Sequence, residues 1–141
     1  MAFVNQIADV VHFCVYKFGG SANKNIGEAF LLIWKFKDKD VIKRGDEVLL
    51  REKSRTKKVT ADLALFSFLK IIAKINKLEQ IVEYSRNPLL LEKMPGFRVR
   101  MGFGLHVGWG IEGAIGSEFK IDASYLSPNV NLAARLEAAS R

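Results

Sequence analysis

The sequence is poor in the residues that build disulfides and metal sites: it has one cysteine, Cys14, and two histidines in 141 residues. A single cysteine excludes an intrachain disulfide framework and a zinc site made of several cysteines, and it agrees with a reducing compartment. No apolar run approaches the roughly 18 residues of a membrane-spanning helix, and residues 1–9 lack the basic-then-apolar pattern of a signal peptide. We therefore expect a cytoplasmic location and no membrane contact from this chain.

The composition is that of a folded domain. Hydrophobic residues make up 49% and charged residues 26%, which excludes a disordered or fibrous chain, and the length suits one domain. The formal net charge is +7, and residues 35–58 alone hold ten basic and five acidic side chains. This concentration predicts a solvated basic loop, with a basic docking site as the alternative, and it does not favour a surface built for nucleic acid.

Three stretches have the apolar periodicity of helices. Residues 3–18 form the first, with Cys14 on its apolar stripe and Gly19-Gly20 as a C-terminal cap. The second runs from residue 61 to about residue 84. The third covers residues 130–139 and follows a serine cap and a first-turn proline at 127–128.

Extended segments are predicted between these helices. A buried strand at 29–36 follows a polar turn at 21–25. Residues 99–107 alternate apolar side chains with arginine, glycine and histidine, which predicts a strand whose glycines allow another backbone or a ligand to approach closely. A turn and return strand follow at 108–116, and a short extended piece at 119–121.

Two connections lack a regular pattern. Prolines at 88 and 95 predict a loop. The tract at 37–60 has no sustained periodicity apart from a possible strand at 48–51, and we expect it to be a mobile insert.

The obvious chemical motifs have plain structural interpretations. Residues 108–113 match the dinucleotide fingerprint GxGxxG, but no helix is predicted to open there, so a glycine-rich hairpin is favoured. His12 and His106 have no second ligand at metal spacing, and both are expected to be structural. Cys14 has no histidine placed beside it by periodicity and is expected to lie in the core.

Two polar segments carry more information. Residues 23–30 bring Lys24 and Glu28 to the mouth of the buried strand. Asn131 and Arg135 are four residues apart near a helix N-terminus, so they share one face at an end that attracts phosphate. Taken alone, this second pair also fits an ordinary exposed helix start.

Three segments resemble the signature motifs of the class III nucleotidyl cyclases, in the family's order and spacing along nearly the whole chain except the insert. The motifs are Lys24-Asn-Ile-Gly-Glu-Ala-Phe30, Arg100-Met-Gly-Phe-Gly-Leu-His-Val-Gly108 and Val130-Asn-Leu-Ala-Ala-Arg135. In residues 120–128 the chain is most similar to the cyclase-like domain of large multidomain protist proteins. The resemblance implies an α+β fold with a ferredoxin-like βαββαβ core, incomplete because the family's first strand and C-terminal strands are absent. Residues 1–141 would be a partial catalytic domain with a basic insert at about 37–60.

The resemblance also implies a reaction. Class III cyclases convert a nucleoside triphosphate into the 3′,5′-cyclic monophosphate and pyrophosphate by in-line attack of the ribose 3′-oxygen. Two Mg²⁺ or Mn²⁺ ions per site, held by two aspartates, assist this attack. Glu28 stands at the second aspartate position, and the first lies on the strand upstream of this chain. We expect this fragment alone to be inactive.

Substrate-binding roles follow in the same way. The position of Lys24 is lysine in adenylyl cyclases and glutamate in guanylyl cyclases, which favours ATP. Ser124 matches the second base-binding position, with Asp122 as the alternative. Asn131 resembles the residue that orients the ribose, and Arg135 the residue that meets the charge on the α-phosphate.

The family works as a head-to-tail dimer or as a pair of cyclase domains, with metal ligands from one protomer and the Asn-Arg pair from the other. We expect this arrangement here, in a domain that is free in the cytosol or attached to a larger membrane protein. An inactive pseudocyclase that regulates or dimerises is the alternative, as is a guanylyl cyclase. RNA binding on a ferredoxin-like sheet is not favoured, because the strand at 99–107 offers only Phe103 for base stacking.

Overall fold

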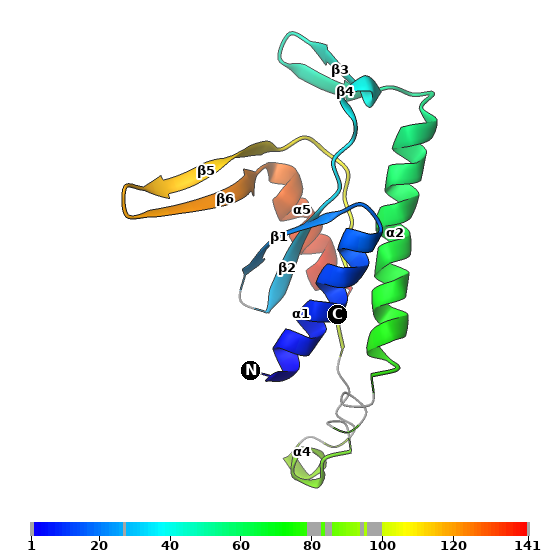
Figure 1. The fold of residues 1–141 in the computed structure, drawn as a ribbon, viewed down its shortest axis with the longest axis vertical. Coiled ribbons are helices and arrows are strands. Elements are labelled where there is room, and N and C mark those ends of the chain that lie inside the picture. Colours follow the sequence, from blue (N-terminus) through cyan, green and yellow to red (C-terminus); the bar gives the residue numbers. More distant parts are fainter. Residues whose placement is uncertain are drawn as a thin grey trace.

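The computed structural model describes residues 2–26, 28–78, 83, 86–93, 95 and 100–140, which form a mixed α/β structure (Figure 1). The elements are α1 (Ala2–Lys17), β1 (Ser21–Ile26), β2 (Ala29–Ile33), a 3₁₀ turn η1 (Asp38–Asp40), β3 (Val41–Arg44), β4 (Glu47–Leu50), α2 (Arg55–Ile75), α4 (Pro88–Lys93), β5 (Ile111–Ser117), β6 (Lys120–Leu126) and α5 (Pro128–Ala139).

The strands pair as three separate antiparallel hairpins, β1–β2, β3–β4 and β5–β6. Figure 1 shows β3–β4 beyond the N-terminal end of α2 and β5–β6 projecting as an arm away from the helices. An isolated two-stranded hairpin is marginally stable in water. Each hairpin therefore depends on contacts with the rest of the chain for its position.

The core lies between α1 and α2. The helix stripe predicted for residues 3–18 is confirmed, and Cys14 is buried as expected. The main buried residues are Ile7, Val11, Cys14 and Val15 of α1 and Phe68, Ile71 and Ile75 of α2. The C-terminal cap is also confirmed, because Gly19, two residues after the end of α1, adopts a φ of +76°. The indole Nε1 of Trp34 donates to the Phe18 carbonyl at 3.1 Å and ties the end of β2 to this cap.

The polar turn expected at 21–25 is wrong, because these residues belong to β1. Ser21 lies opposite Ile33 and Lys24 opposite Leu31 in the β1–β2 register. Backbone pairing with the more apolar β2 makes this polar stretch a strand, although the exposed side chains give no strand pattern. The strand expected at 29–36 is present and ends earlier, at Ile33.

The strand expected at 48–51 is present as β4, but the rest of the tract at 37–60 is more regular than expected. It contains η1, the β3–β4 hairpin and the start of α2. Gly45, with a φ of +57°, begins the two-residue turn between β3 and β4. The Ser54 hydroxyl donates to the buried Asp40 carboxylate and closes the base of the hairpin. Mobility of this insert stays a prediction.

Helix α2 begins at Arg55, six residues before the predicted start. Ser54 is its N-cap and accepts a hydrogen bond from the Lys57 amide at 3.2 Å. The helix ends at Ile75, with Asn76 as its C-cap, so the predicted end near residue 84 is wrong. The loop predicted around Pro88 is wrong, since Pro88 opens the short helix α4 and the Asn87 side chain caps the Leu89 amide at 3.0 Å.

The strand predicted at 99–107 is absent from the described part of that range, residues 100–107. The alternating residues nevertheless face different parts of the fold, because Met101 and Phe103 pack against the core while the glycines face α5. A Cβ on Gly104 would collide with the Ala133 carbonyl oxygen. The close approach expected of the glycines is therefore confirmed, and the approaching backbone is that of α5.

The C-terminal predictions are largely confirmed. A return strand is present as β5, and the extended piece expected at 119–121 grows into the seven-residue β6. Residues 108–110 lead into β5 and not into a helix, so the GxGxxG match belongs to a hairpin. Ser127 caps α5 and Pro128 occupies its first turn, as predicted.

Candidate active site

Lys24 of β1 and Ser124 of β6 meet although they are 100 residues apart in sequence. The Lys24 Nζ donates to the Ser124 Oγ at 2.8 Å. Ser124 is only 5% exposed, so this hydroxyl has a fixed environment. Beside this contact, the Asn23 amide donates to the Ala123 carbonyl at 3.5 Å. The fold thus brings together the two positions that the sequence singled out for base binding.

Asp122 does not take part in this contact. Its carboxylate lies 3.3 Å from the Lys120 Nζ in an exposed ion pair along β6. Because side chains alternate along a strand, Asp122 and Ser124 project from the same face. Lys24 of β1 is hydrogen-bonded to Ser124 and not to Asp122.

The first turn of α5 is fastened to the segment that precedes β5. The Ser127 hydroxyl donates to the Trp109 carbonyl at 2.5 Å, and the Asn129 amide donates to the same carbonyl at 3.0 Å. His106 Nε2 lies 3.0 Å from the Asn129 Oδ1. His106 is therefore structural, as expected, but no sequence signal identified Asn129 as its partner.

Asn131 and Arg135 lie on α5 one turn apart, and both are exposed. Within the described part of the chain, no hydrogen bond or ion pair occupies either side chain. Their amide and guanidinium groups are therefore free to meet a ligand. The helix holds them on a common face, because residues four apart are neighbours on a helix surface.

Glu28 is exposed in the turn between β1 and β2. The described residues contain no group of three or more histidine, cysteine, aspartate or glutamate side chains that could hold a metal ion. Glu28 supplies one carboxylate, whereas magnesium needs several oxygen ligands in octahedral geometry. The described residues do not fit a two-metal site on their own.

A second charged contact was not predicted. The Lys35 Nζ lies 2.5 Å from the Glu112 Oε2, and the Tyr125 hydroxyl donates to the Glu112 Oε1 at 3.0 Å. The hydrogen bond to Glu112, reinforced by Tyr125, raises the pKa of Lys35. The same bond from Lys35, followed by that from Tyr125, lowers the pKa of Glu112. Lys35 and Glu112 are 77 residues apart, so no local pattern could have revealed this contact.

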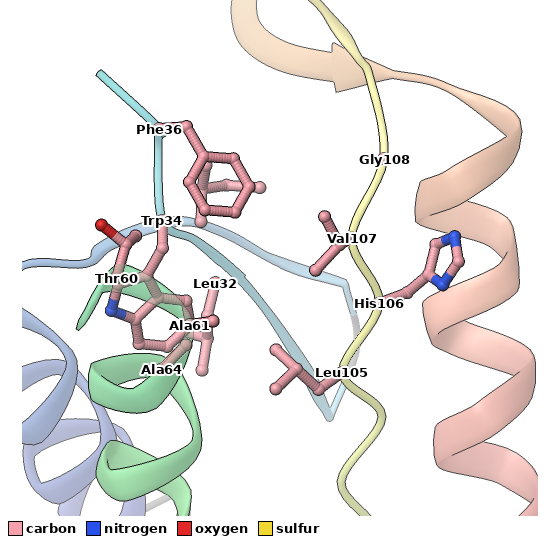
Figure 2. A pocket seen from close by; sticks show the side chains of 11 residues that line it. Leu32, Trp34, Phe36, Thr60, Ala61, Ala64, Leu105, His106, Val107 and Gly108 are labelled. Atoms are coloured by element: carbon pink, nitrogen blue, oxygen red, sulfur yellow. The ribbon is translucent and has the colours of Figure 1, made fainter. Parts of the chain in front are cut away.

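A small apolar cavity separates β2 from the segment before β5 (Figure 2). It has a volume of about 140 Å³, and its lining includes Leu32, Trp34, Phe36, Ala64, Leu105 and Val107. Figure 2 shows His106 pointing away from these side chains, toward α5. The cavity offers no cluster of polar groups for a nucleotide, so we place the candidate site at the β1–β6 contact and α5.

No helix in the described residues has the length and apolarity needed to cross a membrane.

Comparison with known proteins gives matches among solved structures only. No family model matches the sequence, and no curated protein matches it. Two structures of a bacterial light-regulated adenylyl cyclase align with 98% and 96% of this chain, at 30% and 28% identity and TM-scores of 0.65 and 0.62. The adenylyl cyclase CyaB from P. aeruginosa aligns with 98% of the chain at 18% identity and a TM-score of 0.64, which shows a shared fold.

The chain spans 56% and 31% of the two light-regulated cyclase chains and 59% of CyaB. The predicted fold class, an incomplete ferredoxin-like cyclase core, is confirmed. The chain is a class III adenylyl cyclase-like domain with an incomplete form of the cyclase fold.

Proposed function

We propose that this domain converts ATP into cyclic AMP and pyrophosphate for intracellular signalling. The observation that carries the proposal is the 2.8 Å hydrogen bond between Lys24 and Ser124. An ammonium group can donate to the adenine N1, and a serine oxygen can accept from the exocyclic amino group. Without a base, the two groups satisfy each other. Guanine presents an N–H at the corresponding ring position and would need an acceptor in place of Lys24.

Asn131 and Arg135 act on the rest of the nucleotide. The Asn131 amide can orient the ribose through its hydroxyl groups. The Arg135 guanidinium is always charged and presents donors in a planar fork, so it can bind the charge that grows on the α-phosphate oxygens. Both side chains are exposed on the same helix face, which supports a role at a ligand that approaches from outside this chain's core.

The reaction forms the bond between the ribose 3′-oxygen and the α-phosphorus and breaks the bond from that phosphorus to pyrophosphate. The 3′-hydroxyl proton passes to water as the attack proceeds, and pyrophosphate leaves with the electron pair of the broken bond. Cyclases of this class use Mg²⁺ or Mn²⁺, and Glu28 is the one predicted ligand in this chain. Because the described residues do not fit a metal site alone, we derive the chain's contribution from its base-binding and phosphate-binding side chains.

A dimer is part of the proposal. The β5–β6 arm is exposed along most of its length, and Phe119 at its tip is 95% exposed. Apolar side chains displayed in this way favour a protein partner over solvent. We propose a head-to-tail pair of cyclase domains in which Asn131 and Arg135 of one protomer complete a site that begins at Glu28 of the other.

The test is cyclic nucleotide production from ATP and from GTP, with Mg²⁺ or Mn²⁺, by the protein that contains this domain. Arg135→Ala should lower production by about 10²- to 10³-fold, while Arg44→Ala, the same change at an exposed position of β3, should leave it unchanged. Cyclic GMP as the product would overturn the Lys24 assignment. A folded dimer that binds ATP and forms neither product would identify a regulatory pseudocyclase.

A further inference from the structure

A second lysine of the β1–β2 region contacts the β5–β6 arm. Lys35 lies two residues after the end of β2, and its Nζ reaches the Glu112 carboxylate of β5. Glu112 and Tyr125 are direct cross-strand partners, and the Tyr125 hydroxyl binds the other oxygen of that carboxylate. The Lys35 Nζ also lies 5.7 Å from the centre of the Tyr125 ring, in range of a cation–π interaction. We call Lys35, Glu112 and Tyr125 the clamp.

The clamp and the Lys24 contact hold adjacent residues of β6. Successive side chains of a strand point to opposite faces, so Ser124 and Tyr125 are held from opposite sides. Both lysines come from the same part of the fold, one from β1 and one from just beyond its partner β2. Contacts from Lys24 and Lys35 therefore hold β6, the strand that carries Ser124, on both of its faces.

The arm needs such contacts because no third strand supports it. β5 and β6 are hydrogen-bonded only to each other among the described strands. Among the described residues, the side-chain hydrogen bonds between the arm and residues 21–35 are those made by Asn23, Lys24 and Lys35. Loss of the Lys35 contact would leave the bonds from Asn23 and Lys24 of β1 as the described side-chain hydrogen bonds between the arm and the β1–β2 region.

We propose that Lys35, Glu112 and Tyr125 are positioning residues that keep Ser124 within reach of Lys24 and thereby set the affinity for the adenine base. This inference rests on the proposed function. The clamp touches no substrate and acts only through the placement of β6. The Lys35 and Glu112 side chains are 57% and 58% exposed, so salt should weaken the clamp.

The first test measures the position of β6 without any nucleotide. Acylation of Lys24 by an amine-reactive ester is followed by mass spectrometry in the 141-residue chain, with Ser124→Ala defining the rate for a released Lys24. We expect Glu112→Gln and Lys35→Met to speed Lys24 acylation by about two- to fivefold, the scale of one exposed ion pair. Lys120→Met, which removes an ion pair internal to the arm, should leave the rate unchanged.

Two milder variants keep this test decisive if Glu112→Gln or Lys35→Met unfolds the chain. Tyr125→Phe removes one hydroxyl and should give a smaller increase, whereas Lys35→Arg keeps the charge and should restore the slow rate. Raising the salt concentration should speed Lys24 acylation in the unaltered chain and not in Lys35→Met. Equal Lys24 rates in the unaltered chain and in folded clamp variants would overturn the proposal.

The second test separates the clamp from the proposed function. ATP binding is measured by calorimetry for the protein with Lys35→Met, with Ser124→Ala, and with both. A clamp that acts through Ser124 lowers ATP affinity in the first variant and has no further effect in the Ser124→Ala background. Additive losses would overturn positioning through Ser124. Absence of ATP binding by the unaltered protein would sink the adenylyl function, while the acylation result still decides whether the clamp positions β6.

Discussion

The candidate site has two proposed halves, a base-binding side and a phosphate-binding side, and they differ in how far the contacts within this chain fix their side chains. On the base-binding side, Lys24 and a buried Ser124 are already hydrogen-bonded to each other. On the phosphate-binding side, Asn131 and Arg135 are exposed on α5 with no described partner, and Glu28 is alone in its turn. The base-binding side is thus preorganised by contacts between hairpins, whereas the phosphate-binding side presents charges that need a partner.

This difference indicates how the two halves should respond to substitution. Removal of the contacts that hold a preorganised group should weaken substrate binding, because the fold no longer fixes the geometry of that group. Substitution of a charge that is exposed until substrate arrives should lower kcat, because that charge contributes in the transition state. The comparison would fail if substitutions on the base-binding side lowered kcat, or if substitutions on the phosphate-binding side weakened ATP binding.

The largest expected effect is on the phosphate-binding side. Arg135→Ala should lower kcat by about 10² to 10³, as loss of one group that stabilises developing charge does, and should change ATP affinity little. Arg135→Lys should recover only part of kcat, because an ammonium group lacks the planar fork. Steady-state kinetics of cyclic AMP formation measure both. A rise in KM at constant kcat would instead place Arg135 in ground-state binding.

The support of α5 is tested next. Gly104→Ala forces a Cβ into the α5 backbone near Ala133 and should destabilise the fold by about 1 to 3 kcal/mol. Gly113→Ala is the matched control, because no atom lies within 4 Å of the Cβ it would add. Urea unfolding of both variants gives the free energies. Equal stability of the two would show that residues 101–108 are not packed against α5.

A smaller effect is expected on the base-binding side. Ser124→Ala removes one hydrogen-bond partner and should weaken ATP binding by about fivefold, the typical worth of one hydrogen bond, with kcat nearly unchanged. Ser117→Ala, an exposed serine at the end of β5, serves as the control. Titration with ATP and GTP measures the change. A large loss of kcat in Ser124→Ala would contradict the division between the two halves.

The smallest effect is the pH dependence of the clamp. The pKa of Glu112 is lowered from 4.5, so its contribution to stability is present above that value and is lost as the pH falls through the folded pKa. The pKa of Lys35 is raised from 10.5, so its contribution is present below that value and is lost as the pH rises through the folded pKa.

Thermal unfolding of the unaltered chain and of Lys35→Met across this range checks the sign of the clamp's pH dependence. The difference in Tm between the unaltered chain and Lys35→Met should be small, because the charges of Lys35 and Glu112 are both exposed. It should be constant at neutral pH and vanish toward both extremes. A difference that grows on acidification would show that Lys35 does not pair with Glu112.

The sequence predicted the helices better than the strands, and the reasons are physical. The apolar stripe of α1 and the Ser127 cap of α5 are local patterns, and both are confirmed. Strand β1 is polar and was missed, because its extended form comes from pairing with β2. Residues 100–107 were assigned wrongly, because alternation reports which side chains face the core and not whether a neighbouring strand is available.

The candidate site was accessible from sequence only through motif positions. The resemblance placed Lys24 and Ser124 in one site, and the structure brings the two side chains together. The roles of all the predicted site residues stay predictions: Lys24, Ser124, Asp122, Glu28, Asn131 and Arg135. The Lys35–Glu112 contact could not be predicted, because it joins distant residues and depends on the angle between two hairpins. Likewise, nothing in the local pattern indicated that Asn129 would bind His106.

The Lys24–Ser124 contact also has a consequence for the order of folding. It closes a loop of about one hundred residues, and contacts of high sequence separation form late because loop-closure entropy opposes them. The three hairpins form from local pairings, and the α1–α2 core joins segments that are closer in sequence than Lys24 and Ser124 are, so both can form before this contact does. The chain therefore acquires its base-binding geometry at the end of folding, and the same hydrogen bond that prepares the site reports that the domain has reached its native state.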